Sequence, residues 1–237
     1  MSPYFVHLIE SPSSADLLDG RTEGRMLTEA LQLVQIPCSY NLATSLDTLE
    51  AALHDRLNGA LESFSRFPII HFSLHGNQHG IQLTSGEFVS WDALREHLEP
   101  INTAMKNGLI VCMSSCFGGW GSRMAMHEQK PVPFFALVGH NESAKWDDLA
   151  IGFATFYHHI GKGSDITSAV SAMKVASGDD RFMSANGQQV QQGWTAYIRQ
   201  QRIESLATKL AAAGNAQPST ETPLSQLLQP PKTQKMA

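Results

Sequence analysis

The sequence is poor in cysteine and has no long apolar run. Its three cysteines, Cys38, Cys112 and Cys116, cannot all pair and show no framework spacing, which argues against a disulfide-stapled secreted scaffold. Nowhere do about 18 apolar residues run together, so no membrane-spanning helix is expected. The first residues lack the basic and apolar segments of a signal peptide. We therefore expect a cytoplasmic protein that does not act in a membrane.

Charge is also scarce. Only 16% of the 237 residues are charged, and the formal net charge is −5 without any run of Lys or Arg. Such a chain offers no electrostatic reason to bind nucleic acid or an anionic membrane, and we expect neither as a partner. The hydrophobic share of 42% is ample for one large core.

Short apolar runs alternate along the chain with segments of helical periodicity. Strands are predicted at 4–9, 38–42, 67–74, 109–113 and 133–138, and a hairpin or loop at 80–89 with Gly86 at its turn. Helices are predicted at 26–34, 46–57, 91–98, 149–160 and 166–176, the second with Ser45 as its N-cap. This alternation is typical of βαβ units, so the predicted fold class is α/β, with a mostly parallel central sheet and helices on both faces.

The last part of the chain is harder to interpret. Residues 178–193 are polar and rich in Gly and Gln, which predicts a long functional loop. Residues 194–210 fit either a strand or a helix. From about Gly214 the composition is that of a linker, so we expect one domain over 1–213 and a flexible tail over 214–237. The loop or the tail would then regulate access to the site.

Two predicted strands end in residues that can carry nucleophilic chemistry. The strand that begins at Leu109 runs out into Ser114-Ser115-Cys116 and paired glycines, and the strand at 67–74 runs out into His75-Gly76. Because sites in parallel sheets lie outside the carboxyl ends of the strands, Cys116 and His75 should be neighbours in space. A thiol beside an imidazole is the arrangement of nucleophilic cysteine catalysis.

Other interpretations of these residues were weighed. Cys116 could be a buried apolar side chain and His75 a strand end, although the pair together favours catalysis. His71, His75 and His79 are spaced by four, but on a strand such neighbours lie about 13 Å apart, too far to share a metal ion. A serine nucleophile at Ser114 or Ser115 lacks the Gly-x-Ser-x-Gly turn. We therefore expect neither a metal nor another cofactor.

Three motifs together resemble the caspase-like (clan CD) cysteine peptidases, and among them the bacterial CHAT-type peptidases. They are His-Phe-Ser-Leu-His-Gly at 71–76, Ser-Ser-Cys-Phe-Gly at 114–118 and Ala-Leu-Val-Gly-His at 136–140, the last leading into Trp146-Asp-Asp and Phe156-Tyr157. The resemblance covers roughly residues 65–176. It implies a three-layer caspase-like fold, His75 as general base, Cys116 as nucleophile, and the amide groups of Gly76 and Cys116 as the oxyanion hole.

The chain departs from that family where substrate specificity is determined. Ser114 stands where caspases and metacaspases carry a Gln or Asp that helps to form the pocket for the P1 side chain, the residue before the cleaved bond. Glu142, Asp147 and Asp148 follow a rim strand and are equally interpreted as a helix N-terminal charge cluster or as pocket residues. One carboxylate there would select a basic P1 residue.

The sequence thus predicts a cysteine endopeptidase that cleaves protein or peptide substrates after a basic residue. The resemblance suggests a bacterial immune or cell-death effector, switched on by a small-molecule or protein activator. The alternative is a catalytically inactive peptidase-fold module that binds a ligand or protein partner through the same rim.

Overall fold

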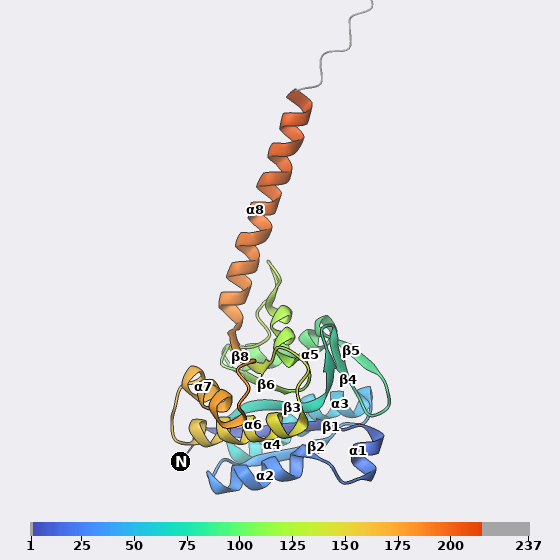
Figure 1. The fold of residues 1–237 in the computed structure, drawn as a ribbon, viewed down its shortest axis with the longest axis vertical. Helices are drawn as coiled ribbons and strands as arrows, with labels where there is room; N and C mark the ends of the chain where they lie inside the picture. Colours follow the sequence, from blue (N-terminus) through green and yellow to red (C-terminus); the bar gives the residue numbers. More distant parts are fainter. Residues whose placement is uncertain (1, 215–237) are drawn as a thin grey trace, which may run out of the picture. The chain divides into compact units, whose positions relative to one another are not determined.

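The computed structural model describes residues 2–214, and all of its strands lie in a compact unit formed by residues 1–195. A second unit begins at Ala196. The central sheet has the order β2-β1-β3-β6-β7-β8, and β4 and β5 form a hairpin on the end of β3 (Figure 1). The strands are β1 Tyr4–Ser11, β2 Cys38–Leu42, β3 Phe67–Asn77, β4 Gly80–Gln82, β5 Phe88–Ser90, β6 Ile110–Ser114, β7 Ala136–His140 and β8 Phe182–Asn186.

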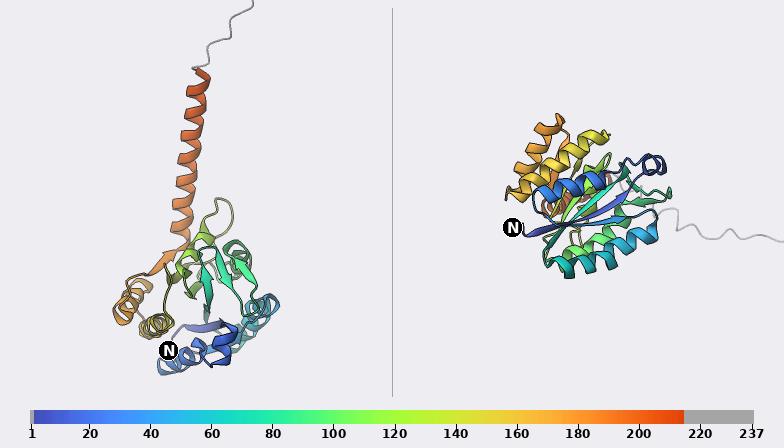
Figure 2. Two further views of the ribbon diagram at one scale, coloured as in Figure 1. Left: turned by 45° about the vertical axis from the view of Figure 1, so that its right-hand side comes forward. Right: turned by 90° about the horizontal axis from the view of Figure 1, so that it is seen from below.

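The five strands β2, β1, β3, β6 and β7 are parallel, and only the edge strand β8 runs antiparallel to its neighbour in this order. Helices cover both faces of the sheet (Figure 2). The helices of the described chain are α1 Ser14–Leu18, α2 Glu23–Leu33, α3 Leu46–Ala51, η1 Ala52–Arg56, α4 Leu57–Phe64, α5 Trp91–Ala104, η2 Gly118–Ala125, α6 Trp146–Gly161, α7 Ile166–Ser177 and α8 Gly187–Gly214. The predicted three-layer α/β fold class is confirmed.

The core is divided into two clusters by the sheet. Apolar residues of α3, η1, α4 and α5 pack on one face, and those of α2, α6 and α7 pack on the other. Alternate residues of each strand belong to opposite clusters, as Phe5 and Val6 of β1 do, because successive side chains of a strand point to opposite faces. A parallel sheet covered in this way needs apolar residues on both sides, which explains the unbroken apolar runs in the sequence.

One strand is longer than the sequence predicts. β3 continues through His75 and Gly76 to Asn77, because His75, Gly76 and Asn77 pair antiparallel with Gln82, Ile81 and Gly80 of β4. His75 is therefore held by a hairpin, where a loop position was expected. Residues 80–89, expected as a hairpin or a loop, form a hairpin, and Gly86 at its turn takes a left-handed conformation at φ +91°.

The prediction of a long loop over 178–193 is wrong. Phe182–Asn186 forms β8, which pairs with β7, and α8 starts at Gly187. Residues 194–210, left open between strand and helix, belong to α8. The predicted tail beyond Gly214 lies outside the described residues. Within the described part of the chain, no helix combines the length and apolar character that a bilayer crossing requires.

Candidate active site

A row of polar side chains crosses three neighbouring strands at their carboxyl ends. Glu10 of β1 pairs in register with Ser73 of β3, which pairs in turn with Ser114 of β6. Two residues earlier, the same face carries Leu8, His71 and Cys112, and all three are fully buried. On the side of the sheet that faces α2 and α6, the strands thus carry fully buried residues first and a row of polar residues at their carboxyl ends.

A cavity of about 350 Å³ opens over this polar row. His75 stands two residues beyond Ser73 on β3, and Cys116 lies in the turn that follows Ser114 at the end of β6. Both line the cavity, so the structure brings the predicted thiol and imidazole to one site. The cavity is lined by Glu10, Pro12, Asp16, Arg21, Glu23, Ser73, Leu74, His75, Ser114, Ser115, Cys116, Ala144, Trp146, Asp147 and Leu149.

His75 has a carboxylate beside it. Its Nε2 lies 3.7 Å from Oδ2 of Asp16, and the imidazole is 57% exposed. Asp16 is in turn held at the start of α1, where its amide donates to Oγ of Ser13 at 3.0 Å and its carboxylate accepts from the same hydroxyl. Asp16 can therefore orient the imidazole while leaving one ring nitrogen free for chemistry.

Gly76 allows β3 to approach the cysteine segment closely. A Cβ atom at this position would lie 2.7 Å from the carbonyl oxygen of Cys116 and 3.1 Å from Oγ of Ser115. Any side chain would push these two segments apart, so a glycine is required for β3 and the cysteine segment to approach this closely. The backbone of Gly76 is thereby kept beside the backbone of Cys116, the two positions that the resemblance gives to the oxyanion hole.

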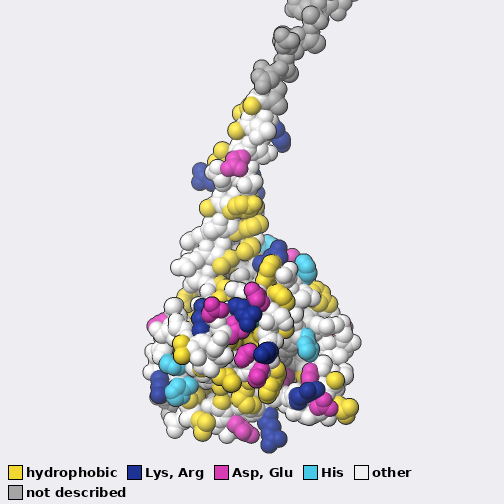
Figure 3. All heavy atoms as spheres, in the orientation of Figure 1, with side chains coloured by type: hydrophobic (Ala, Val, Ile, Leu, Met, Phe, Trp, Pro, Cys, Tyr) yellow, Lys and Arg dark blue, Asp and Glu magenta, His cyan; other side chains and the backbone are white. Residues whose placement is uncertain are grey.

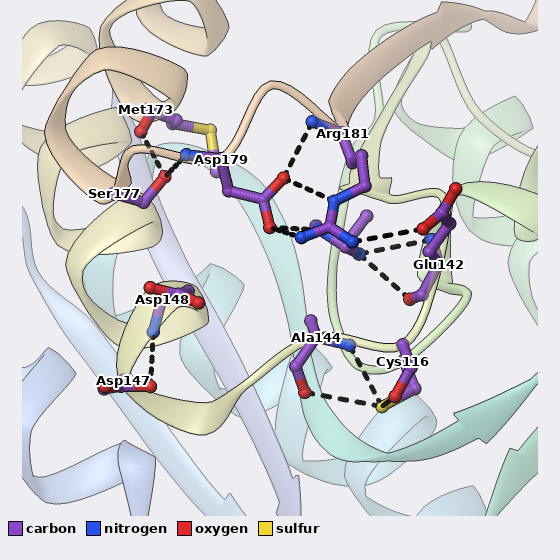
Figure 4. Close-up of polar contacts among 11 residues, drawn as sticks. Cys116, Glu142, Ala144, Asp147, Asp148, Met173, Ser177, Asp179 and Arg181 are labelled. Atoms are coloured by element: carbon purple, nitrogen blue, oxygen red, sulfur yellow. Dashed lines mark hydrogen bonds and ion pairs between the residues drawn. The ribbon is translucent and has the colours of Figure 1, made fainter.

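The sulfur of Cys116 contacts the loop that follows β7. It accepts a hydrogen bond from the amide of Ala144 at 3.4 Å, and it lies 3.6 Å from both the carbonyl of Ala144 and Oγ of Ser143. The next residue, Phe117, has a left-handed backbone at φ +56°, which is costly for a residue other than glycine. Its amide donates to the carbonyl of Glu142 at 2.8 Å, so the same loop holds both residues in place (Figure 4).

That loop is fixed by His140, the last residue of β7, and by Asp179 and Arg181, which lie just before β8. Asp179 receives His140 Nε2 at 3.0 Å and the guanidinium of Arg181 at 2.6 and 2.8 Å. The hydrogen bonds from Arg181 hold the pKa of Asp179 well below its usual range. Nδ1 of His140 lies 2.9 Å from the carbonyl of Glu142. We call Asp179, Arg181 and His140 the loop anchor.

The three acidic residues that were predicted as candidate pocket residues do not all line the cavity. Asp147 lines the cavity, whereas neither Glu142 nor Asp148 is among the described residues that line it. Glu142 instead points to Arg181, 3.1 Å from its Nη1 (Figure 4). Ser114 does line the cavity, and its hydroxyl donates to Glu23. Over this face of the molecule, acidic and basic side chains lie next to one another (Figure 3).

Sequence reasoning missed four charged residues of the cavity: Glu10, Asp16, Arg21 and Glu23. Asp16 and Arg21 belong to the segment around α1, to which the sequence pattern had assigned no element. Arg21 pairs with Asp16 at 3.4 Å and with Asp19 at 2.6 Å. A signal for Glu10 was present, since a carboxylate at the end of a buried strand is unusual.

The three cysteines lie in different surroundings. Burial raises the pKa of the Cys112 thiol to about 12 and that of the Cys38 thiol to about 11. Cys116 lines the open cavity. Because the thiolate is the reactive form, we expect iodoacetamide at pH 7 to alkylate Cys116 and to leave Cys38 and Cys112 unmodified in the folded protein.

Mass spectrometry of tryptic peptides after a time course would measure the three rates separately. In urea all three cysteines should be labelled, which controls for peptide detection. Rapid labelling of Cys112 in the folded protein would contradict the packing described above.

Two alternatives for the site were a metal centre and a serine nucleophile. Within residues 2–214, no group of three or more His, Cys, Asp or Glu is placed to hold a metal ion. Among the three histidines spaced by four, His71 is buried, with Nδ1 3.0 Å from the hydroxyl of Tyr157, whereas His75 lines the cavity. Oγ of Ser115 is buried without a hydrogen-bond partner.

Comparison with models of known protein families finds no match, and neither does comparison with curated protein sequences. Among solved structures, the chain matches the crystal structure of the Arg-specific cysteine proteinase gingipain R with a TM-score of 0.48 and 10% sequence identity. The match covers 74% of this chain and 42% of gingipain R, so the chain spans less than half of that protein.

Proposed function

We propose that the protein is a cysteine endopeptidase in which Cys116 is the nucleophile and His75 the general base. The observation that carries the proposal is that both side chains line one open cavity at the carboxyl ends of two paired parallel strands. The resemblance of the motifs around them to caspase-like peptidases supports the same roles. The CHAT-type assignment is part of this proposal.

The chemistry follows from the groups at hand. His75 takes the proton of the Cys116 thiol, and the sulfur attacks the carbonyl carbon of the scissile bond. The amides of Gly76 and Cys116 stabilise the oxyanion that forms. The protonated imidazole then gives its proton to the leaving amine, which leaves a thioester on Cys116. Water, deprotonated by His75, hydrolyses the thioester and restores the thiol.

We also propose that the enzyme is regulated and cleaves after a basic residue. The hydrogen bonds between the sulfur of Cys116 and the loop at 143–144 must change when a substrate enters, and an activator that moves this loop would control turnover. A role as a cytoplasmic immune or cell-death effector in bacteria rests on the motif resemblance alone.

The test is a cleavage profile. Wild-type protein and a Cys116→Ala variant are incubated with a proteome-derived peptide library, and new amino termini are identified by mass spectrometry. We expect termini that follow Arg or Lys with wild-type protein and none above background with the variant. Cleavage by Cys116→Ala would end the peptidase proposal. A folded wild-type protein that cleaves nothing and whose Cys116 resists alkylation would favour the alternative, a non-catalytic binding module.

A further inference from the structure

Two buried carboxylates stand at the floor of the cavity. Glu23, the first residue of α2, is 3% exposed and Glu10 is 1% exposed, although both line the cavity. Glu23 accepts hydrogen bonds from the hydroxyls of Ser73 at 2.6 Å and Ser114 at 2.7 Å. Glu10 accepts from the amide of Gly24 at 2.9 Å and from the hydroxyl of Tyr40 at 2.8 Å. All four donors are neutral groups.

Neither carboxylate has a cationic partner in the described part of the chain. Arg21 is the one Lys or Arg that lines the cavity there, and it pairs with Asp16 and Asp19. His71 faces Glu23, with Nε2 3.8 Å from Oε1, but burial lowers the pKa of this imidazole to about 3, so it is neutral. Nε2 of His71 is buried and has no hydrogen-bond partner.

This arrangement is incomplete as it stands. A buried carboxylate is expensive unless a cation and hydrogen bonds compensate for the lost water, and here the hydrogen bonds are present and the cation is not. The cavity that leads from Cys116 to Glu23 also holds Asp16 and Asp147, so four carboxylates face one arginine. Its floor is complementary to a positive group.

We propose that Glu23, supported by Glu10, binds the guanidinium or ammonium group of a substrate side chain at the floor of this cavity. The inference rests on the proposed peptidase function, because it identifies that side chain as the P1 residue. The specificity carboxylate is then the buried Glu23, in place of Glu142 and Asp148, which do not line the cavity.

The protonation of Glu23 makes this binding depend on pH. Burial, with a smaller effect of the negative charge on Glu10, raises the pKa of Glu23 to about 7, against the hydrogen bonds from the two serines. A cation favours the ionised form, so binding near pH 7 should release a proton. The titratable and charged groups that face Glu23 from the elements around it are Glu10, Asp16, Arg21, His71, His75, Cys116, Asp147 and Tyr157.

The experiment measures binding without turnover. Full-length Cys116→Ala protein is titrated with N-acetyl-arginine amide by calorimetry at pH 6 and pH 8, and with the citrulline amide, a neutral analogue of the same shape. We expect the arginine amide to bind about tenfold more tightly at pH 8 than at pH 6, because ionised Glu23 increases about tenfold over this range. The citrulline amide should bind weakly at both values.

Adding Glu23→Gln should weaken binding of the arginine amide at pH 8 at least tenfold and remove its pH dependence. Glu29→Gln, on the same helix but 69% exposed, is the matched control and should change neither. Equal affinity for the arginine and citrulline amides, or unchanged binding in Glu23→Gln, would overturn the proposal.

If Glu23→Gln does not fold, the affinities of the two amides at pH 6 and pH 8 still test whether the cavity binds a cationic side chain. Binding of the arginine amide by a protein that cleaves no peptide would remove the peptidase function and leave the cation site standing. Cleavage without preference for basic residues would leave the peptidase function standing and remove the cation site.

Discussion

Replacing Cys116 with alanine is expected to reduce kcat/KM for peptide cleavage by a factor on the order of a thousand or more, because the acyl-enzyme step needs the sulfur. His75→Ala should cause a similar loss, since the thiol then loses the imidazole that accepts its proton. The double variant should be no worse than either single variant, because the two residues act as a unit.

The measurement is a double-mutant cycle on a fluorogenic arginine peptide. Stability should change little, since His75 is more than half exposed and Cys116 is only half-buried. Cys38→Ala is the matched control, because this thiol does not line the cavity, and it should leave kcat/KM unchanged. Losses that multiply in the double variant would mean that Cys116 and His75 act in separate steps.

The second large effect concerns stability. The pKa of Glu23 rises from an ordinary value of 4.5 in the unfolded chain to about 7 in the folded protein. Between these values the folded state holds a proton that the unfolded state has lost, so stability falls as pH rises through this window and stays low above it. A difference of this size corresponds to about 3 kcal/mol.

Glu23→Gln removes the titrating group and should be more stable relative to wild type at pH 8 than at pH 5, by about 2.5 kcal/mol. Urea unfolding at the two pH values measures the difference, and Glu29→Gln should follow the wild-type curve. A gap between Glu23→Gln and wild type that is the same at both pH values would show that Glu23 is already ionised in the folded protein at pH 5.

The sheet could be predicted because its signals are local. Strand 38–42 follows Pro37 and was predicted with the bounds that β2 has. The helix at 46–57 was predicted from its cap, and the hydroxyl of Ser45 does accept from the amide of Thr48. β8 has no such signal: Phe-Met-Ser-Ala-Asn is neither an apolar run nor a clear alternation, and it becomes a strand because β7 leaves an edge open for it.

In the candidate site, too, the residues with a local signal could be predicted and those that depend on long-range contacts could not. Cys116 and His75 could be singled out because each comes at the end of its own apolar run, and parallel strands gather their carboxyl ends at one edge of the sheet. Glu23 could not, since its role depends on α2 lying over Ser73 and Ser114, a contact between segments far apart in the chain. Asp16 was missed for a smaller reason, because α1 has only five residues and shows no periodicity.

The loop anchor has a consequence for the order of events during synthesis. His75 and Cys116 leave the ribosome before Asp179 and Arg181, and the loop that holds the sulfur is fixed only when these last residues have folded against His140. The nascent chain therefore carries the reactive thiol without its finished surroundings. Since domains complete folding as units, the candidate site is completed only by the segment that leads into β8. A chain that stops short of this segment is expected to leave that loop unanchored.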